Sequence, residues 1–179
     1  MTGAEQARPP RMPEICTPRL RLRPLVAGDL DHLHALLTQP GVRRYLLDDE
    51  VIPRERTQSF IDTSTASFAS DGYGLWGATT RESGALVGFC GFWRFHDPPR
   101  LELLYGLGDD ARGRGYATEM AAAMIRYGFE VLKFDRIEAS TDAPNTASIA
   151  VMERVGMSFR KQGITNGLDT VYYAVDAAR

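Results

Sequence analysis

The stretch from Leu101 to Lys133 constrains the fold of this 179-residue chain more than any other. It begins with a predicted strand over 101–107, continues through a short charged loop over 109–117, and then becomes a long helix. Apolar residues recur on one side of that helix, at the spacing of a helix that packs on a core. They are Ala117, Met120, Ala121, Met124, Gly128, Val131 and Leu132.

The loop of this stretch has the features of an anion-binding site. Gly113 and Gly115 lack the Cβ atoms that would keep a ligand away from the backbone. The start of a helix has unpaired N–H groups and a positive partial charge, and Arg112 and Arg114 add two charged donors. The pattern predicts a site for a phosphate or pyrophosphate, and the alternative is a glycine-rich turn that caps a core helix.

Two cofactor classes fit such a site. For a dinucleotide, the segment 106–111 matches the G-x-G-x-x-A pattern after a strand, although this match alone is weak. Asp109 and Asp110 would stand where the pyrophosphate must lie, and the helical pattern begins several residues too late. An acyl-coenzyme A is the second class.

Composition and charge exclude several other classes. Hydrophobic residues make up 44% and charged residues 25%, and the net charge of −2 provides no basic surface for nucleic acid. No apolar run approaches the roughly 20 residues that span a bilayer. Residues 1–14 are polar and proline-rich and lack a signal-peptide core, so we expect a flexible tail over 1–15 before a single domain over 16–179.

Cysteine and histidine are sparse. Cys16 and Cys90 are too few for a disulfide scaffold and form no C-x-x-C motif, which favours the cytoplasm. His32, His34 and His96 are scattered, so we expect no metal site.

The order of the expected elements predicts a mixed α/β (α+β) fold. Leucine and arginine alternate over 17–24, as in a half-buried strand, and Asp29 is expected to cap the next helix. No regular βαβ series follows, so the sheet should be mixed. We expect helices over 30–37, 42–46, 53–68, 117–132 and 146–155, and further strands over 73–79, 86–94, 101–107, 136–141, 157–162 and 170–175.

Three blocks, in this order, resemble the GNAT superfamily of N-acetyltransferases. Thr17–Pro24 with Asp29 resembles the T-x-R-L-x-L-R-P…D opening of the ribosomal-protein N-terminal acetyltransferase branch. The loop 112–117 resembles the Q/R-x-x-G-x-G/A cofactor signature, and the segment 142–157 resembles the N-x-x-S…E-K-x-G-F block. The resemblance extends from about Cys16 to the C-terminus.

The resemblance implies a mostly antiparallel sheet with flanking helices, whose central strands 101–107 and 136–141 splay apart around acetyl-CoA. The pyrophosphate would lie on backbone N–H groups of the loop, and the pantetheine arm on the edge of the first strand. Asn145 would contact the cofactor, cap a helix, or do both. The implied cofactor-binding residues are Leu104, Tyr105, Leu107, Arg112, Gly113, Arg114, Gly115, Tyr116, Ala117, Thr118, Asn145 and Ser148.

Acetyl transfer to an amine needs a neutral amine, a polarised thioester carbonyl and a proton for the leaving thiolate. A strand N–H can polarise the carbonyl, a contribution on the order of 3 kcal/mol. By resemblance, Glu102 is the candidate base, because it lies on the cofactor strand just before the splay. The alternatives are an outward-facing glutamate, a partner for Arg94 or Arg100, and a relay of water molecules.

The proton donor for the thiolate is open. Many superfamily members place a tyrosine seven residues after the asparagine, where this chain has Met152, which cannot donate a proton. Ser148, Tyr105 and an ordered water are the remaining candidates, with Ser148 expected to be catalytic. Cys90 would allow a covalent acetyl-enzyme, but we expect it in a buried strand without a nearby histidine.

The resemblance thus implies an acyltransferase that moves an acetyl group from acetyl-CoA directly to a primary amine, either a protein N-terminus or a small amine. The alternatives are an acyl-CoA-binding or sensing module without turnover, which Met152 would suit, and, less well supported, a dinucleotide oxidoreductase. We expect no nucleic-acid or membrane partner, and a homodimer is open. The acidic loop 48–50 is either solvated or attracts a cationic acceptor.

Overall fold

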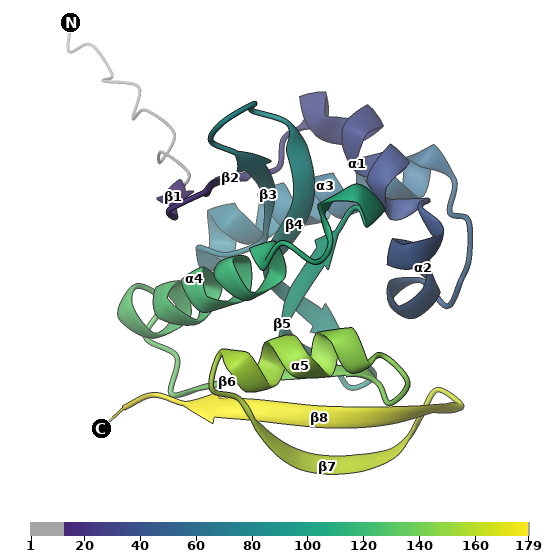
Figure 1. Ribbon diagram of the computed structural model, residues 1–179, viewed down its shortest axis with the longest axis vertical. Coiled ribbons are helices and arrows are strands. Elements are labelled where there is room, and N and C mark those ends of the chain that lie inside the picture. Colours follow the sequence, from purple (N-terminus) through teal and green to yellow (C-terminus); the bar gives the residue numbers. More distant parts are fainter. Residues whose placement is uncertain (1–12, 179) are drawn as a thin grey trace, which may run out of the picture.

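The computed structural model describes residues 13–178, which form one eight-stranded sheet with helices on both faces (Figure 1). The strand order is β1-β2-β3-β4-β5-β6-β8-β7, and every neighbouring pair except β5–β6 is antiparallel. The strands are β1 (Ile15–Cys16), β2 (Leu20–Pro24), β3 (Leu75–Thr80), β4 (Leu86–Phe95), β5 (Arg100–Leu107), β6 (Arg136–Asp142), β7 (Ser158–Thr165) and β8 (Leu168–Asp176). The predicted mixed, mostly antiparallel sheet is confirmed.

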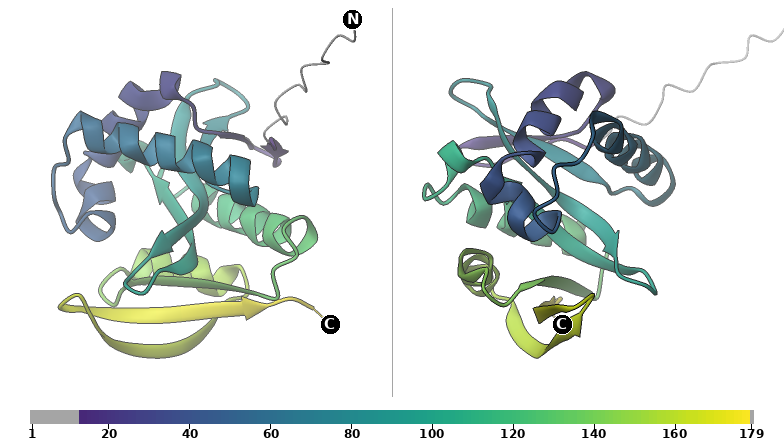
Figure 2. Two further views of the ribbon diagram at one scale, coloured as in Figure 1. Left: turned by 180° about the vertical axis from the view of Figure 1, so that it is seen from behind. Right: turned by 90° about the vertical axis from the view of Figure 1, so that its right-hand side faces the viewer.

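Helices α3 and α4 cover opposite faces of this sheet (Figure 2). The helices are α1 (Leu30–Leu37), α2 (Pro40–Leu46), α3 (Arg54–Asp71), α4 (Tyr116–Glu130) and α5 (Thr146–Arg154), with short 3-10 turns η1 (Ala27–Asp29) and η2 (Asp109–Ala111). No helix in the described part of the chain is long and apolar enough to cross a membrane.

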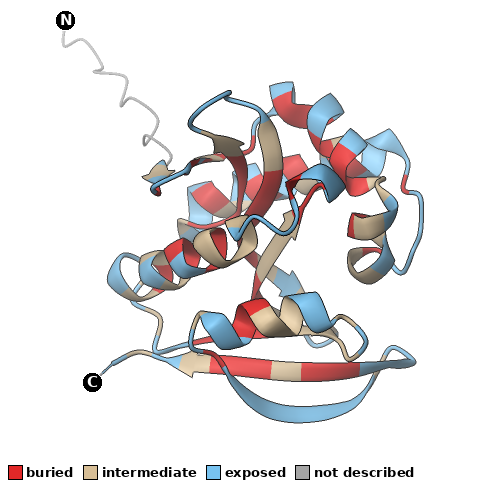
Figure 3. Cartoon of the chain, in the orientation of Figure 1, coloured by how far each residue is buried: buried red, intermediate tan, exposed pale blue. Residues whose placement is uncertain are grey.

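Two hydrophobic cores hold the helices on the sheet, and the buried segments follow the inner faces of these elements (Figure 3). Under α4 and α5, fully buried Met120, Met124 and Met152 pack with strand residues. Under α1 and α3, Leu33 and Ile61 are 1% exposed and belong to the second core. Burial of each such side chain contributes about 1.5–3 kcal/mol, so the helical spacing of apolar residues fixes which face each helix presents to the sheet.

The sheet divides between β5 and β6. The two strands run parallel and pair at one position, Glu102 opposite Glu138. Beyond it, β5 remains paired with β4 and β6 remains paired with β8. The edge of β5 after Glu102 therefore faces an opening rather than a strand, which confirms the predicted splay.

Some local details differ from the sequence-based expectation. Asp29 does not cap α1, because its carboxylate accepts hydrogen bonds from Arg23 at 2.6 and 2.8 Å and from the backbone N–H of Val26 at 2.9 Å. Residues 1–12 of the expected tail over 1–15 lie outside the described residues. At its end, Ile15 pairs with Leu22. The carbonyl of Pro13 also accepts a 2.8 Å hydrogen bond from the Trp76 indole.

Candidate active site

A cavity of about 730 Å³ lies where β5 and β6 separate, and its size is typical of a cofactor or ligand site. It is lined by β5, β6, α2, α5 and the loop that leads into α4. Most of the predicted site residues line it, namely Glu102, Leu104, Tyr105, Leu107, Arg112, Gly113, Gly115, Ala117, Thr118, Asn145 and Ser148.

The loop has the backbone that its glycines predict. Gly113 and Gly115 have φ angles of 72° and 79°, in the left-handed region where side chains with a Cβ are strained. Gly115 is the N-cap residue of α4, and no side chain of the described residues caps this helix start. Its first N–H groups therefore remain available to an anion, as the pyrophosphate interpretation requires.

The dinucleotide interpretation fits this geometry poorly. The segment 106–111 leads into the short turn η2 rather than into a long helix. The backbone N–H of Asp109 donates to the Gln39 side chain at 2.7 Å, and the Asp109 carboxylate lies 3.4 Å from Arg112. These contacts stabilise the turn, and the Asp109 carboxylate would repel a pyrophosphate placed there.

Arg114 and Tyr116 are the two predicted site residues that do not line the cavity. Both are in contact with Arg19 instead. The Arg19 guanidinium donates to the Arg114 carbonyl at 2.7 Å and lies 4.8 Å from the centre of the Tyr116 ring.

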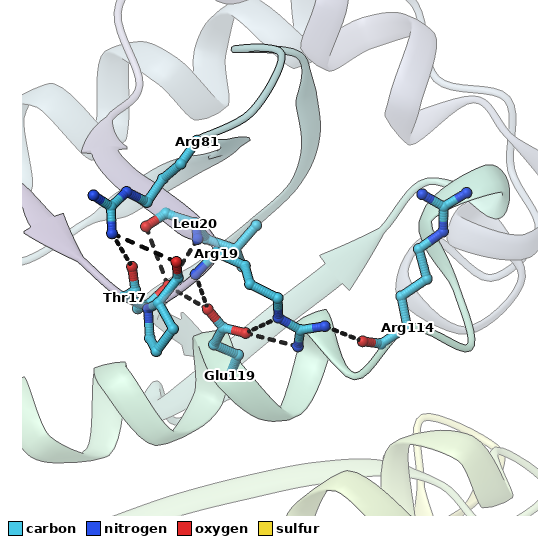
Figure 4. A network of polar contacts seen from close by, with 7 residues as sticks. Thr17, Arg19, Leu20, Arg81, Arg114 and Glu119 are labelled. Carbon is cyan, nitrogen blue, oxygen red and sulfur yellow. Dashed lines mark hydrogen bonds and ion pairs between the residues drawn. The ribbon is translucent and has the colours of Figure 1, made fainter.

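Figure 4 shows the polar network to which Arg19 belongs. Glu119 of α4 accepts hydrogen bonds from the Thr17 hydroxyl at 2.6 Å, from the Arg19 backbone at 2.8 Å and from the Arg19 side chain at 2.7 Å. Burial raises the pKa of Glu119, but these hydrogen bonds outweigh it, and the net pKa lies below the ordinary value. Thr17 and Arg19 of the first sequence block thus tie this block to α4 and to the glycine loop, a role that the sequence did not reveal.

Glu102 is the buried carboxylate of the cavity, with a side chain that is 2% exposed. Its Oε1 lies 2.9 Å from His96 Nε2, and its Oε2 accepts a 2.5 Å hydrogen bond from Ser140. The alternative pairing with Arg94 or Arg100 is wrong, because Arg94 donates to Tyr73 and Arg100 to Glu138.

Sequence reasoning missed His96 and Ser140, both of which line the cavity. From the sequence, His96 is only one of three scattered histidines that could be weighed as metal ligands. It follows β4, and the hairpin formed by β4 and β5 returns the chain so that His96 lies beside Glu102. Ser140 comes from β6, beyond the long helix α4. Within residues 13–178, no group of three or more His, Cys, Asp or Glu side chains could hold a metal ion.

On the other side of the cavity, Asn145 is both the helix cap and a lining residue. Its Oδ1 accepts the Ser148 backbone N–H at 3.3 Å, and its amide donates to Thr141 at 2.9 Å. The Tyr105 hydroxyl contacts Ser148. Two hydroxyl groups therefore meet where the sheet opens.

Of the acidic loop, Asp48 alone lines the cavity. Asp49 pairs with Arg43 at 2.8 Å and Glu50 with Arg56 at 2.7 Å. Burial, followed by the negative charge of Asp48, raises the pKa of Asp142, which also lines the cavity. The cavity thus has an acidic region that a cation would neutralise.

Cys90 and Met152 are fully buried. Burial raises the pKa of the Cys90 thiol far above its ordinary value, so this cysteine is not a thiolate, and it does not line the cavity. Met152 packs in the core under α5 and forms part of the cavity wall.

Comparisons with known proteins agree with this geometry. The acetyltransferase (GNAT) domain family matches residues 19–158. An uncharacterized N-acetyltransferase, p20 of Bacillus licheniformis, is 31% identical over 158 residues, which are 86% of this chain and 85% of p20.

Solved structures of acetyltransferases share the fold. An acetyltransferase from Agrobacterium tumefaciens strain C58 superposes with a TM-score of 0.81 at 24% identity, over 98% of this chain and 100% of that chain. The RimL ribosomal L7/L12 alpha-N-protein acetyltransferase in complex with coenzyme A has a TM-score of 0.76 at 19% identity, over 92% of this chain and 98% of that chain.

Proposed function

Because this chain belongs to the GNAT family of acetyltransferases and is an acyltransferase, we propose that it transfers the acetyl group of acetyl-CoA directly to a primary amine. The observation that carries the proposal is the single cavity that joins three features. These are a left-handed glycine loop at an uncapped helix start, an open edge of β5, and the buried carboxylate Glu102.

The chain's own groups fit acetyl-CoA, which would supply the activated acyl group. Backbone N–H groups of the loop 112–117 would hold the pyrophosphate, with Arg112 as an additional cation. The unpaired edge of β5 over 104–107 would accept the pantetheine arm through backbone hydrogen bonds. The mostly apolar strand side chains beside it would exclude water from the thioester.

The chemistry divides between the two walls of the cavity. A backbone N–H of β5 would polarise the thioester carbonyl, which contributes on the order of 3 kcal/mol. The negative charge of Glu102 favours removal of a proton from the acceptor ammonium. The hydroxyls of Tyr105 and Ser148 lie together on the other side, where one of them would protonate the departing thiolate.

The acceptor is a primary amine at the end of a peptide or on a small molecule. The resemblance of the first sequence block and the likeness to RimL favour a peptide N-terminus, while the carboxylates of Asp48 and Asp142 suit any cationic amine. Fold does not determine substrate, so both kinds of acceptor belong in the test.

The test measures release of the coenzyme A thiol from acetyl-CoA in the presence of a panel of amines. The panel contains peptides that begin with serine or alanine, polyamines, amino acids and amine antibiotics, and mass spectrometry identifies the product. We expect amine-dependent release with one acetyl group added to the acceptor. Binding of coenzyme A by calorimetry without release for any amine would instead indicate a sensing module, and absent binding would exclude both functions.

A further inference from the structure

Glu102 is poorly placed to contact an acceptor. Both of its carboxylate oxygens are occupied, one by His96 and one by Ser140, and its side chain is 2% exposed. Little of the carboxylate surface is therefore left for an amine to contact. The carboxylate is instead placed to orient the His96 imidazole and the Ser140 hydroxyl.

The pairing determines which nitrogen of His96 is free. An ionised carboxylate only accepts hydrogen bonds, so the Nε2 atom that lies 2.9 Å from Glu102 must carry a hydrogen. In the neutral ring, the lone pair is then on Nδ1. Among residues 13–178, Nδ1 has no hydrogen-bond partner. This nitrogen is therefore free to accept a proton.

His96 lies at the cavity in an uncommon backbone conformation. Its φ angle is 68°, in the left-handed region that few residues other than glycine adopt. Its side chain is 18% exposed, against 2% for Glu102, and it lines the cavity. Strained conformations of this kind cluster at functional sites, where the surrounding structure maintains them.

The other groups around His96 are an aromatic ring and the cations next to that ring. The centre of the Tyr172 ring of β8 lies 6.0 Å from the centre of the His96 imidazole. The cations of Arg100 and Lys161 lie 5.7 and 4.7 Å from the centre of that ring. Glu102 is thus the carboxylate in direct contact with the imidazole.

Resting on the proposed function, we propose that His96 removes the proton from the acceptor amine, and that Glu102 and Ser140 are positioning residues. The N–H bond of the ammonium breaks, and the proton moves to Nδ1, directly or through one water. The amine lone pair then forms the C–N bond at the acetyl carbon, and the C–S bond breaks. The second amine proton ends on the thiolate, and the imidazolium, stabilised by Glu102, releases its proton to solvent.

His96→Gly tests this role without imposing backbone strain, because glycine adopts a positive φ readily. With the best acceptor of the amine panel, we expect kcat to fall by roughly 10²-fold or more, while KM for acetyl-CoA changes less than about twofold. Added imidazole should restore at least a tenth of the lost rate. Lys133→Gly is the matched control, because Lys133 is exposed, has a φ of 59° and lies outside the cavity. Its activity should not change.

Glu102→Gln separates positioning from proton removal. We expect kcat to fall in this variant too, but imidazole should not restore it, because His96 is still present. A loss of less than threefold in a folded His96→Gly protein overturns the proposal. The proposal is also overturned if added imidazole does not raise the activity of His96→Gly.

A second measurement needs no acceptor. In nitrogen-15 NMR of the parent protein, the neutral His96 ring should carry its hydrogen on Nε2, and Glu102→Gln should weaken that preference. Hydrogen on Nδ1 overturns the proposal even if acetyl transfer is observed. If the ring has the expected tautomer but no amine is acetylated, the proposed function fails, and the catalytic role of His96 fails with it.

Discussion

The Tyr105 hydroxyl lies 2.9 Å from the Ser148 Oγ and 3.0 Å from the Ser148 carbonyl oxygen, and it joins β5 to α5. Met152 stands where the superfamily pattern has a tyrosine, so this pair is a candidate source of a hydroxyl proton. Burial raises the pKa of Tyr105 to about 12, and the hydrogen bond with Ser148 only partly offsets it. Tyr105 therefore keeps its proton at neutral pH and has a hydroxyl hydrogen to donate.

If Tyr105 protonates the thiolate, Tyr105→Phe should lower kcat by about 10²-fold and leave coenzyme A binding near normal. Ser148→Ala should cost less, because the tyrosine hydroxyl remains. Since the raised pKa keeps the hydroxyl protonated below about pH 12, the parent should lose no activity through this group between about pH 8 and 10. Steady-state kinetics across pH provide the check. Equal kcat in parent and Tyr105→Phe would assign the proton to water.

Gly115→Val should weaken coenzyme A binding at least tenfold. A β-branched residue is strained at the observed φ of 79°, and its Cβ would lie 3.3 Å from the Arg19 guanidinium, so the Arg19 side chain must give way. Gly167→Val is the control, because it places the same residue at a φ of 80° in the β7–β8 turn, where a Cβ meets nothing within 4 Å. Calorimetry on the folded proteins measures the coenzyme A affinity of both variants. Unchanged affinity in Gly115→Val would show that the loop does not bind the cofactor.

Arg19→Ala should loosen the same loop from a distance, because it removes the donors to Glu119 and to the Arg114 carbonyl. The Arg19 side chain is half exposed, so the effect should be modest, about a threefold rise in the coenzyme A Kd. Arg21→Ala is the control, because Arg21 belongs to the same block and pairs with Glu14 instead. It should leave the coenzyme A Kd unchanged. Equal affinities in both variants would assign the network in Figure 4 to stability alone.

Asp48→Asn should raise KM for a cationic acceptor and spare KM for acetyl-CoA. Interactions between exposed charges are screened over about 8 Å at physiological salt, so the rise should be largest at low salt. Asp49→Asn is the matched control, because Asp49 pairs with Arg43 and does not line the cavity. A salt series in which all three proteins share one acceptor KM would show that the loop is only a solvated surface.

Cys90→Ala should retain the parent kcat, because the buried thiol is protonated and lies outside the cavity. In the native protein, iodoacetamide should modify exposed Cys16 and leave Cys90 unmodified until the chain unfolds. Mass spectrometry of the alkylated protein measures the modification of each cysteine. An acetyl group found on Cys90 after incubation with acetyl-CoA would establish a covalent route and exclude direct transfer.

Features that depend on short separations along the chain could be predicted from the amino-acid sequence. Apolar spacing placed α4 and the face it buries, and glycine at positions 113 and 115 indicated the left-handed loop before it. Three ordered blocks indicated the family, which the comparisons confirm, and the cofactor residues that they implied mostly line one cavity, although their roles stay predictions. Local backbone preferences and periodicity are properties of neighbouring residues, so they can be read before folding.

Which polar groups meet could be learned only from the folded arrangement. His96 reaches Glu102 because β4 and β5 form a hairpin, and Ser140 joins them because β6 lies parallel to β5 at one position. Arg19 contacts Glu119 across 100 residues of chain. Such pairings follow from strand register and from the packing of helices on the sheet, which no spacing along the chain encodes, and they determine which carboxylates are held in the interior and which are left to solvent.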